Sequence, residues 1–542
     1  MVNMPLRLFP RATLHHAVRG LWLVVLGGLA IPVSAAVRLP RLFSDQMVIQ
    51  RDRPAPVWGW ADPGEQVTVR FGGQQAACTA NDEGAWMVRL KPLPASSQPR
   101  DLIVSGADTL VVRNVVVGDV WLCSGDFGVF WETFGCVNAA KEIATANRPL
   151  IRLLKVESKS SNTPLTDIQG AWKVCSPETV ADFSALAYFF GRTLHQEIRV
   201  PIGLIDASYR YSSIQSWISP EGFRMIPELK LPRDKMDSWN STTPAGREAY
   251  LATIDKVEQW LPAAEQAFQE HKPIPPQPVP PAPIPANDSN YRSLGELSNL
   301  YYGMIAPLMP FAFRGVVWSM GENGGGLEWA KYHFYLRGLV DGWRAGWGQG
   351  DFPVYFELLP QVGNSDGQPG AGGYWAGFRA RQMEGLSIPN TGMAVTFDVS
   401  DYLAETRNRQ DAGQRLALWA LAREYHRAIE CSGPLYHSHR VEADRVIISF
   451  DHVGRGLMAG EKDGLAPVRP AKSGVLKGFA VAGADKKWYR ADARIVGKTI
   501  VARSDKVPTP MAVRYAYADN PAGCNLYNHE GLPTAPFRTD DW

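Results

Sequence analysis

Histidines and cysteines are the residues in this chain whose types and spacing first suggest metal or redox chemistry. His437 and His439 are two positions apart, which places both side chains on one side of a strand, and such an imidazole pair suits a metal ion. No third ligand accompanies them in the sequence, so surface histidines are the favoured interpretation. We therefore expect no metal site and no cofactor.

The cysteines leave two interpretations open. No two of them form a CxxC pair or a metal-like spacing. In an exported chain they are able to form disulfides, whereas buried free thiols would act as small apolar side chains. Sequence alone gives no pairing for the six, which are Cys78, Cys123, Cys136, Cys175, Cys431 and Cys524.

The beginning of the chain has the three parts of an export signal. Arg7, Arg11 and Arg19 form a basic start, residues 21–33 are an apolar run, and Val33-Ser34-Ala35 is a small-residue cleavage site. The apolar run is shorter than a membrane span requires. We therefore expect residues 1–35 to be removed and the protein to be periplasmic or secreted, with no membrane span after cleavage.

The first secondary-structure elements expected after the signal are short strands in which apolar and polar side chains alternate. Residues 67–71 and 86–90 alternate apolar and polar side chains, with turn residues at 62–64 and 81–84. This pattern predicts an N-terminal β-sandwich over residues 36–114.

The pattern then changes to apolar strands separated by helices. Predicted strands lie at 120–123, 201–205, 315–318, 353–356 and 393–397, and predicted helices at 185–198, 328–347 and 410–426. Such alternation predicts an α/β domain over residues 115–431, in which a parallel sheet has helices on both faces. Functional residues are then expected on loops at the carboxyl ends of its strands.

Two further segments complete the predicted organisation. Residues 272–285 (KPIPPQPVPPAPIP) form a polyproline-like spacer, more typical of a stiff surface connection than of a ligand for a partner domain. Alternating strands at 445–450 and 511–515 predict a C-terminal β domain over residues 432–542.

Charge balance excludes one class of partner. The chain has 56 basic and 54 acidic residues, and loss of the predicted signal removes three of the arginines. A nearly neutral chain gives no electrostatic reason to expect binding to nucleic acid.

Several motifs, in order along the chain, resemble those of the sialate O-acetylesterase family, whose central domain belongs to the SGNH hydrolases. The resemblance covers nearly the whole mature chain, and it implies deacetylation of sialic acid by a serine nucleophile, a histidine base and an orienting aspartate. The matching stretches are residues 47–51, 56–61, 118–125, 303–308, 347–353, 416–421 and 530–533.

The nucleophile block departs from this family pattern. The family reads GQSNM where residues 125–129 here read GDFGV, so Phe127 occupies the nucleophile position. A benzyl side chain has neither a lone pair for attack nor a proton for a base to remove. Ser124 lies three residues upstream and is a weak substitute, since a shifted backbone would be needed to bring it into place.

The second and third blocks also differ. The family's second block has two glycines before a threonine, and here Arg210 and Tyr211 lie in the corresponding stretch, where they are expected to crowd the oxyanion site. The third block, usually QGESN, keeps Glu322, while Met320 replaces the glutamine and the asparagine is either absent or shifted to Asn323.

The final block lacks its histidine. Where the family reads DIHP, the alignment places the histidine position on Glu405 or Thr406 and the aspartate position on Leu403 or Ala404. No histidine occurs between residues 334 and 425. The nucleophile, the base, the acid and the oxyanion surroundings therefore depart from the family together, which favours a pseudoenzyme.

The resemblance also implies that Asp126, Glu322 and Glu405 gather near one pocket. A pair of carboxylates can catalyse glycoside hydrolysis. The favoured interpretation is instead that Arg210 neutralises these acids in a structural cluster. A third interpretation is that Arg210 binds the carboxylate of an acidic glycan.

Three hypotheses for function remain. The leading one is an exported, catalytically inactive, carbohydrate-binding member of the family, with a pocket formed by Asp126, Arg210, Tyr211, Glu322 and Asn323. The first alternative is an active carbohydrate O-acetylesterase with a relocated serine nucleophile. The second is a structural or partner-binding exported protein.

Overall fold

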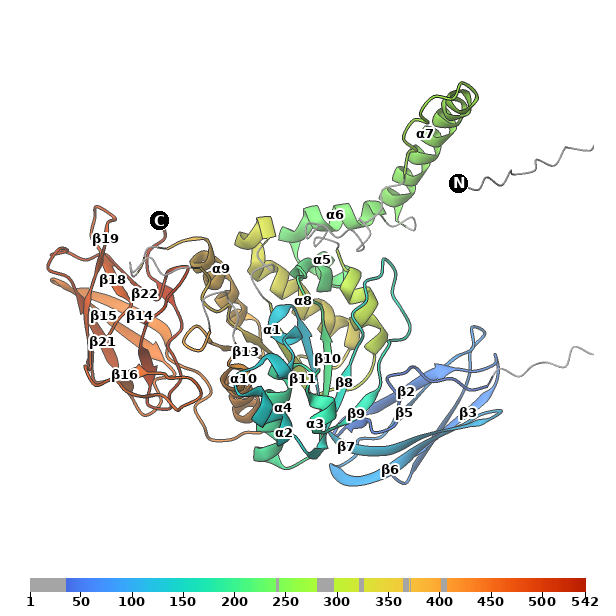
Figure 1. Cartoon of the computed structure of the whole chain (residues 1–542), viewed down its shortest axis with the longest axis horizontal. Helices are drawn as coiled ribbons and strands as arrows, with labels where there is room; N and C mark the ends of the chain where they lie inside the picture. The colour runs from blue at the N-terminus through green and yellow to red at the C-terminus, as the bar shows by residue number, and fades with distance from the viewer. Residues whose placement is uncertain are drawn as a thin grey trace, which may run out of the picture. The chain divides into compact units, whose positions relative to one another are not determined.

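The structure, a computed structural model, describes residues 36–239, 243–279, 297–320, 326–363, 370, 372–400 and 407–542 (Figure 1). The predicted signal, residues 1–35, lies outside this range. Within the range no helix is long and apolar enough to cross a membrane. All six cysteines are free thiols, and four of them are buried, which answers the question of disulfides left open by the sequence.

A mostly parallel sheet forms the centre of the molecule, in the strand order β13-β12-β11-β7-β10-β8-β9. Every neighbouring pair is parallel except β8 and β9 at one edge. The strands are β7 (Thr109–Gly125), β8 (Arg148–Lys155), β9 (Trp172–Cys175), β10 (Ile202–Ser208), β11 (Gly315–Ser319), β12 (Val354–Glu357) and β13 (Thr391–Ala394).

Helices cover both faces of this sheet, as the apolar strands predicted. Trp121 and Cys123 belong to an apolar cluster with helices α4 and α10, whereas Leu122, between them, belongs to the larger cluster that includes α8. This alternation along β7 follows from the period of two in a strand. The helices are α1 (Phe127–Phe130), α2 (Ala139–Ala144), α3 (Pro177–Val180), α4 (Ala185–Ile198), α5 (Pro220–Met225), α6 (Lys230–Trp239), α7 (Pro244–Gln269), α8 (Tyr332–Trp347), α9 (Tyr374–Met383) and α10 (Arg409–Arg423).

Strand β7 is 17 residues long and belongs to both the N-terminal strands and the central sheet. Its first part pairs antiparallel with β6 and its middle pairs parallel with β1, while residues from Asp119 onward pair with β10. The predicted boundary between residues 114 and 115 therefore falls inside a continuous strand. The N-terminal strands are β1 (Val48–Gln50), β2 (Ala55–Trp60), β3 (Gln66–Phe71), β4 (Gln74–Thr79), β5 (Ala85–Leu90) and β6 (Ser96–Ser105).

The C-terminal part is built from antiparallel strands in several small sheets. It contains the two strands expected from the sequence, β15 and β22. Its strands are β14 (Leu435–Glu442), β15 (Arg445–Asp451), β16 (Leu457–Glu461), β17 (Arg469–Pro470), β18 (Phe479–Ala482), β19 (Trp488–Arg490), β20 (Asp492–Val496), β21 (Thr499–Arg503), β22 (Ala512–Tyr515), β23 (Leu526–Asn528) and β24 (Phe537–Arg538).

The proline-rich spacer follows the 26-residue helix α7, which the sequence pattern did not predict. Residues 273–279 form neither helix nor strand, and the rest of the spacer lies outside the described residues. The indole of Trp260 on α7 donates to the carbonyl of Pro275 at 2.8 Å. The described part of the spacer therefore folds back against the helix that precedes it.

Candidate ligand site at the carboxyl edge of the sheet

Strands β7, β10, β11, β12 and β13 are parallel, so their carboxyl ends lie along one edge of the central sheet. The chain order reverses at β7, because β10 and β8 lie on one side of it and β11 to β13 on the other. Ligands of open α/β sheets bind in the crevice at such a reversal point. The segment that follows β7 therefore occupies the position expected for a ligand site.

Two glycines let the end of β7 and the start of α1 approach β11 closely. Gly125 has φ +125°, and a Cβ there would lie 2.0 Å from the carbonyl oxygen of Ser319. A Cβ on Gly128 would lie 1.8 Å from Ser319 Oγ. The backbone N–H of Asp126, between them, donates to the Ser319 carbonyl at 2.8 Å. Position 127 is thereby fixed as the first residue of α1, directly beyond the carboxyl end of β7.

Asp126, a predicted pocket residue, is completely buried. Its carboxylate accepts the backbone N–H of Ser212 at 3.3 Å, and the indole of Trp217 donates to Ser212 Oγ at 2.9 Å. The Tyr209 N–H donates to the Gly125 carbonyl at 3.0 Å. These contacts indicate that Asp126 fastens the loop after β10 to the end of β7.

Arg210 and Tyr211 lie on that same loop. The guanidinium of the exposed Arg210 lies 4.5 Å from the centre of the Tyr211 ring, a cation–π distance. Tyr211 has φ +60°, a left-handed conformation that glycine adopts with less strain than a bulky residue. The glycines that the family has in this block are thus replaced by two large stacked side chains.

Ser124, the weak substitute nucleophile, is completely buried within β7. In the sheet, Ser124 pairs with Ala207 of β10 and Trp318 of β11. Its hydroxyl donates to the Ala207 carbonyl at 2.8 Å. A serine nucleophile instead needs open access to the ester and a base that accepts its proton. This environment disfavours attack by Ser124.

Four other predicted site residues lie outside the described part of the chain. Glu322 and Asn323 belong to the segment 321–325, and Glu405 and Thr406 belong to the segment 401–406. Their roles stay predictions from the sequence.

Sequence reasoning missed a buried ion pair at the ends of β11 and β12. Arg409 Nη1 lies 3.2 Å from both carboxylate oxygens of Glu357, and Ser319 Oγ donates to Glu357 Oε2 at 2.7 Å. Both charged side chains are 2% exposed. Ser319 and Arg409 lie 38 and 52 positions from Glu357 along the chain, so no local spacing in the sequence signals these contacts.

A second ion pair follows β13. The guanidinium of Arg415 donates to both oxygens of Asp398, at 2.5 and 2.7 Å, and the Tyr527 hydroxyl donates to Asp398 at 3.2 Å. Helix α10 therefore supplies two arginines: one neutralises Glu357 at the end of β12, and the other neutralises Asp398 after β13. This arrangement leaves both acids as positioning groups within the fold.

Asp206 on β10 is a further buried acid that the sequence did not single out. Burial raises the pKa of Asp206 to about 6, while a hydrogen bond from Ser208 Oγ, at 2.6 Å, opposes the increase. Its carboxyl therefore changes protonation between pH 5 and 7.

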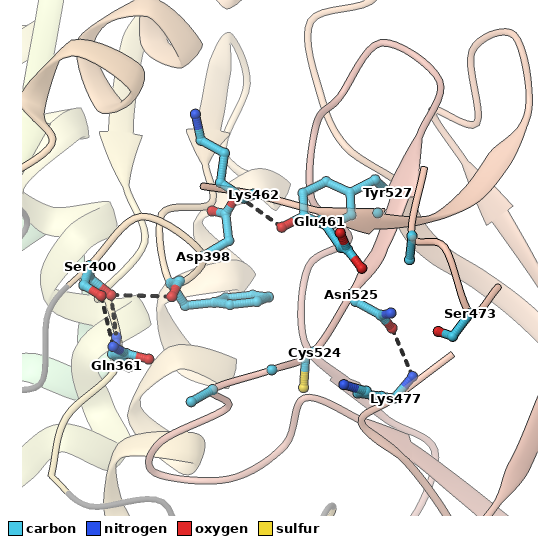
Figure 2. Close-up of a pocket in the computed structure, with 15 residues that line it drawn as sticks. Gln361, Asp398, Ser400, Glu461, Lys462, Ser473, Lys477, Cys524, Asn525 and Tyr527 are labelled. Atoms are coloured by element: carbon cyan, nitrogen blue, oxygen red, sulfur yellow. Dashed lines mark hydrogen bonds between the residues drawn. The ribbon is translucent and has the colours of Figure 1, made fainter. Parts of the chain in front are cut away.

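A cavity of about 320 Å³, lined in part by Asp398, opens between the loops that follow β12 and β13 and the C-terminal strands (Figure 2). Its wall combines amide, hydroxyl, ammonium and carboxylate groups with two aromatic rings. The lining side chains that carry these groups are Gln361, Phe397, Asp398, Ser400, Glu461, Lys462, Ser473, Lys477, Asn525 and Tyr527. They come from separate segments and include none of the pocket residues predicted from the sequence, so no local pattern signals this cavity.

The histidine pair does not form the metal pair that its spacing suits. A register shift between Tyr436 and Ser438 interrupts the regular alternation of β14. His437 Nδ1 lies 3.2 Å from Asp451, whereas His439 Nδ1 lies 2.8 Å from the Tyr436 hydroxyl. The two imidazoles therefore have different partners.

Comparisons with known proteins bear on the resemblance. No protein-family model matches the chain. The sialate O-acetylesterase of Rattus norvegicus is 26% identical over 95% of this chain and 96% of its own, and that of Homo sapiens is 24% identical over 94% and 95%. The crystal structure of a carbohydrate acetylesterase from Xanthomonas citri is 29% identical, covers 94% of this chain and all of its own, and superposes with a TM-score of 0.75. The chain is thus similar to sialate O-acetylesterases and to a carbohydrate acetylesterase over nearly its whole length.

The likeness to the carbohydrate acetylesterase from Xanthomonas citri, together with the sheet topology, confirms the predicted fold class. The central domain is an SGNH-hydrolase-like parallel sheet, and the strands before and after it form the flanking β parts. In this family setting, the departures at positions 125–129 lie at the carboxyl edge where the structure places the candidate ligand site.

Proposed function

We propose that this protein is an exported, non-hydrolysing member of the sialate O-acetylesterase family that binds O-acetylated glycans at the carboxyl edge of its central sheet. The observation that carries the proposal is the phenylalanine at position 127, the first residue of α1 beyond β7. Ester hydrolysis by this fold needs an activated hydroxyl at that place, and phenylalanine offers none.

The surroundings of position 127 support loss of hydrolysis rather than a simple exchange of nucleophile. Ser124 donates its proton to a backbone carbonyl and is buried in the sheet. The family's final block contains no histidine in this chain, so the general base is missing as well. A base and a nucleophile act as one unit, and restoring either alone is not expected to restore the reaction.

The pocket in Figure 2 supports retention of ligand binding. Asn525 and Lys477 offer polar groups suited to sugar hydroxyls, and the rings of Phe397 and Tyr527 offer apolar faces. Carbohydrates present both kinds of surface. The pocket lies beyond the ends of β12 and β13, on the same edge as position 127.

Export is the remaining part of the proposal. Residues 1–35 have the composition of a cleavable signal, and the relatives include a carbohydrate acetylesterase, whose substrate class is compatible with action outside the cytoplasm. Glycans displayed outside the cell are the ligands that such a protein would meet.

One experiment tests the loss of hydrolysis. The purified protein is treated with a fluorophosphonate probe and assayed for acetate release from 9-O-acetyl sialic acid, alongside the Phe127→Ser variant. We expect neither labelling nor acetate release from either protein. Stoichiometric labelling of one serine together with acetate release by the wild type would instead establish the active esterase with a relocated nucleophile.

A second experiment tests glycan binding. Wild type, Arg210→Ala, Asn525→Ala and the control Asp82→Asn, a change at an exposed turn, are screened on an array of O-acetylated and de-O-acetylated glycans. We expect binding by the wild type and the control, with weaker binding by Asn525→Ala because an amide of the pocket is lost. Absence of binding by every protein would favour the structural or partner-binding role.

A further inference from the structure

Three side chains of the types that bind transition metals meet where the central domain leads into the C-terminal strands. Glu430, Cys431 and His452 each bring one ligand atom to a cluster in which all these atoms lie within 4.8 Å of one another. His452 Nδ1 lies 2.6 Å from Glu430 Oε1. The carboxylate, thiol and imidazole come from two segments, residues 430–431 before β14 and residue 452 after β15.

A buried asparagine holds those two segments together. Asn528, which is completely buried, donates through its amide to the Ser432 carbonyl at 2.9 Å and to the His452 carbonyl at 3.2 Å. His452 itself has φ +56°, a left-handed backbone conformation that a non-glycine residue adopts only when its surroundings impose it. The cluster is therefore positioned by the fold before any ligand arrives.

Exposure of the cluster permits an ion to enter. The side chains of Glu430 and His452 are 19% and 24% exposed, whereas Cys431 is buried. The Trp419 ring lies beside His452 at a centroid distance of 5.9 Å, with the two ring planes tilted by 56°. A shielded sulfur with two partly open nitrogen and oxygen ligands resembles zinc sites that keep a position for water.

We propose that Glu430, Cys431 and His452 form a binding site for a thiophilic divalent cation of the Zn²⁺ class. The mixed oxygen, sulfur and nitrogen donor set suits Zn²⁺ and disfavours Mg²⁺ or Ca²⁺, which prefer oxygen ligands alone. The cation takes the place of the hydrogen bond between His452 and Glu430. Cys431 releases its thiol proton and binds as the thiolate, while water completes the tetrahedral shell.

Charge balance in this site favours one divalent ion. One thiolate and one carboxylate neutralise a +2 charge, and the imidazole binds in its neutral form. The guanidinium of Arg423 is able to donate to Cys431 without occupying a ligand position, since it acts on the pKa of that thiol through a side-chain hydrogen bond. Such a contact to a bound thiolate would act as an outer-shell hydrogen bond.

The test is titration of the chelator-treated full-length protein with Zn²⁺ by calorimetry and with Co²⁺ by absorption spectroscopy. We expect one ion per chain and, with Co²⁺, a thiolate charge-transfer band. Cys431→Ser and His452→Ala should each weaken Zn²⁺ binding by at least about tenfold, since even outer-shell changes cost that much. Zn²⁺ should also raise the Tm of the wild type and not that of Cys431→Ser.

Matched controls separate the cluster from adventitious binding. His439→Ala removes another hydrogen-bonded imidazole, and Cys78→Ser removes a half-buried thiol, so both should bind Zn²⁺ as the wild type does. Unaltered Tm values for the ion-free variants would show that they fold. Failure of the wild type to bind Zn²⁺, or equal binding by folded Cys431→Ser, would overturn the proposal.

Discussion

At the residue scale, the packing of the segment after β7 depends on glycine, which has no side chain, as much as on the polar side chains around it. Gly128 lies where α1 meets the ends of β11 and β12, and a Cβ at this position would reach both Ser319 Oγ and the Glu357 carboxylate. Those two groups are themselves hydrogen bonded to each other at 2.7 Å. A methyl group there has to displace a buried polar contact, because neither neighbour belongs to a flexible surface side chain.

Gly128→Ala is accordingly expected to destabilise the protein. The added Cβ would lie 1.8 Å from Ser319 Oγ and 2.9 Å from Glu357 Oε2, and overpacking of this kind costs about 1 to 3 kcal/mol. Urea unfolding measures the change. Gly346→Ala is the matched helical control: its Cβ would meet the end of the flexible Met309 side chain and, at 3.6 Å, the Tyr301 hydroxyl, so the change should be neutral or stabilising. Equal free energies of unfolding for both variants would contradict the prediction.

Asp206 makes stability depend on pH. Burial raises its pKa to about 6 in the folded protein, above the value of an exposed aspartate. The folded state therefore binds the proton more tightly, so this group's stabilising contribution is present below about pH 4 and is lost as the pH rises through about 6. Asp206→Asn should gain roughly 2 kcal/mol relative to wild type between pH 4 and pH 7.

Chemical denaturation of wild type and Asp206→Asn across this pH range measures the effect. Asp82→Asn, at an exposed turn, should show no such trend. A constant difference between wild type and Asp206→Asn over the range would mean that the Asp206 carboxyl does not titrate there.

At the element scale, Asp119 joins segments that are distant in sequence. Its carboxylate accepts hydrogen bonds from Arg51 after β1, Arg314 before β11 and the Tyr425 hydroxyl after α10. Burial alone raises the pKa of Asp119, but the hydrogen bonds and charges of Arg51 and Arg314 outweigh it and hold that pKa below its usual range. The cluster ties the amino-end half of the central sheet to the N-terminal strands.

Asp119→Asn should destabilise the protein by about 3 kcal/mol, because it removes the buried counter-charge of two arginines and leaves them only the exposed Asp52, at 3.6 and 3.8 Å. The depressed pKa means that this stabilisation is present above about pH 4 and fades as the pH falls below that value. Urea unfolding at pH 7 and at lower pH checks both parts. The control Asp492→Asn breaks an exposed pair with Arg494 and should change stability by no more than about 0.5 kcal/mol.

Elements with strong local patterns were predictable from sequence, whereas contacts between them were not. The helix expected at 185–198 coincides with α4, because its apolar face repeats with the helical period. The metal pair that the spacing of His437 and His439 allowed, and that the sequence analysis did not favour, depended on unbroken alternation, which the irregularity in β14 removes. The link between Glu357 and Arg409 joins residues 52 positions apart, so only the folded sheet brings them together.

At the scale of the whole molecule, the chain holds together without covalent cross-links. All six cysteines are free, and burial raises the pKa of Cys136 and Cys431 to about 11 and of Cys175 and Cys524 to about 12. In the metal-free protein such thiols remain protonated and unreactive at neutral pH. Packing and hydrogen bonds therefore supply the stability that disulfides give to many exported proteins.

A reducing agent is thus expected to leave the Tm of the metal-free protein unchanged. Alkylation in denaturant without prior reduction should modify all six cysteines, which intact mass spectrometry counts. Fewer than six additions, restored to six by reduction, would reveal a disulfide and contradict the prediction.

Strand β7 also limits how this architecture changes in evolution. Its 17 residues carry the backbone hydrogen bonds of the N-terminal strands at one end and reach the candidate ligand site at the other. Recombination near residue 114 would sever a shared ladder and leave unpaired strand edges on both fragments, which promotes aggregation. Exchange of the N-terminal strands as an independent module is therefore expected to disturb the central sheet that carries the candidate site.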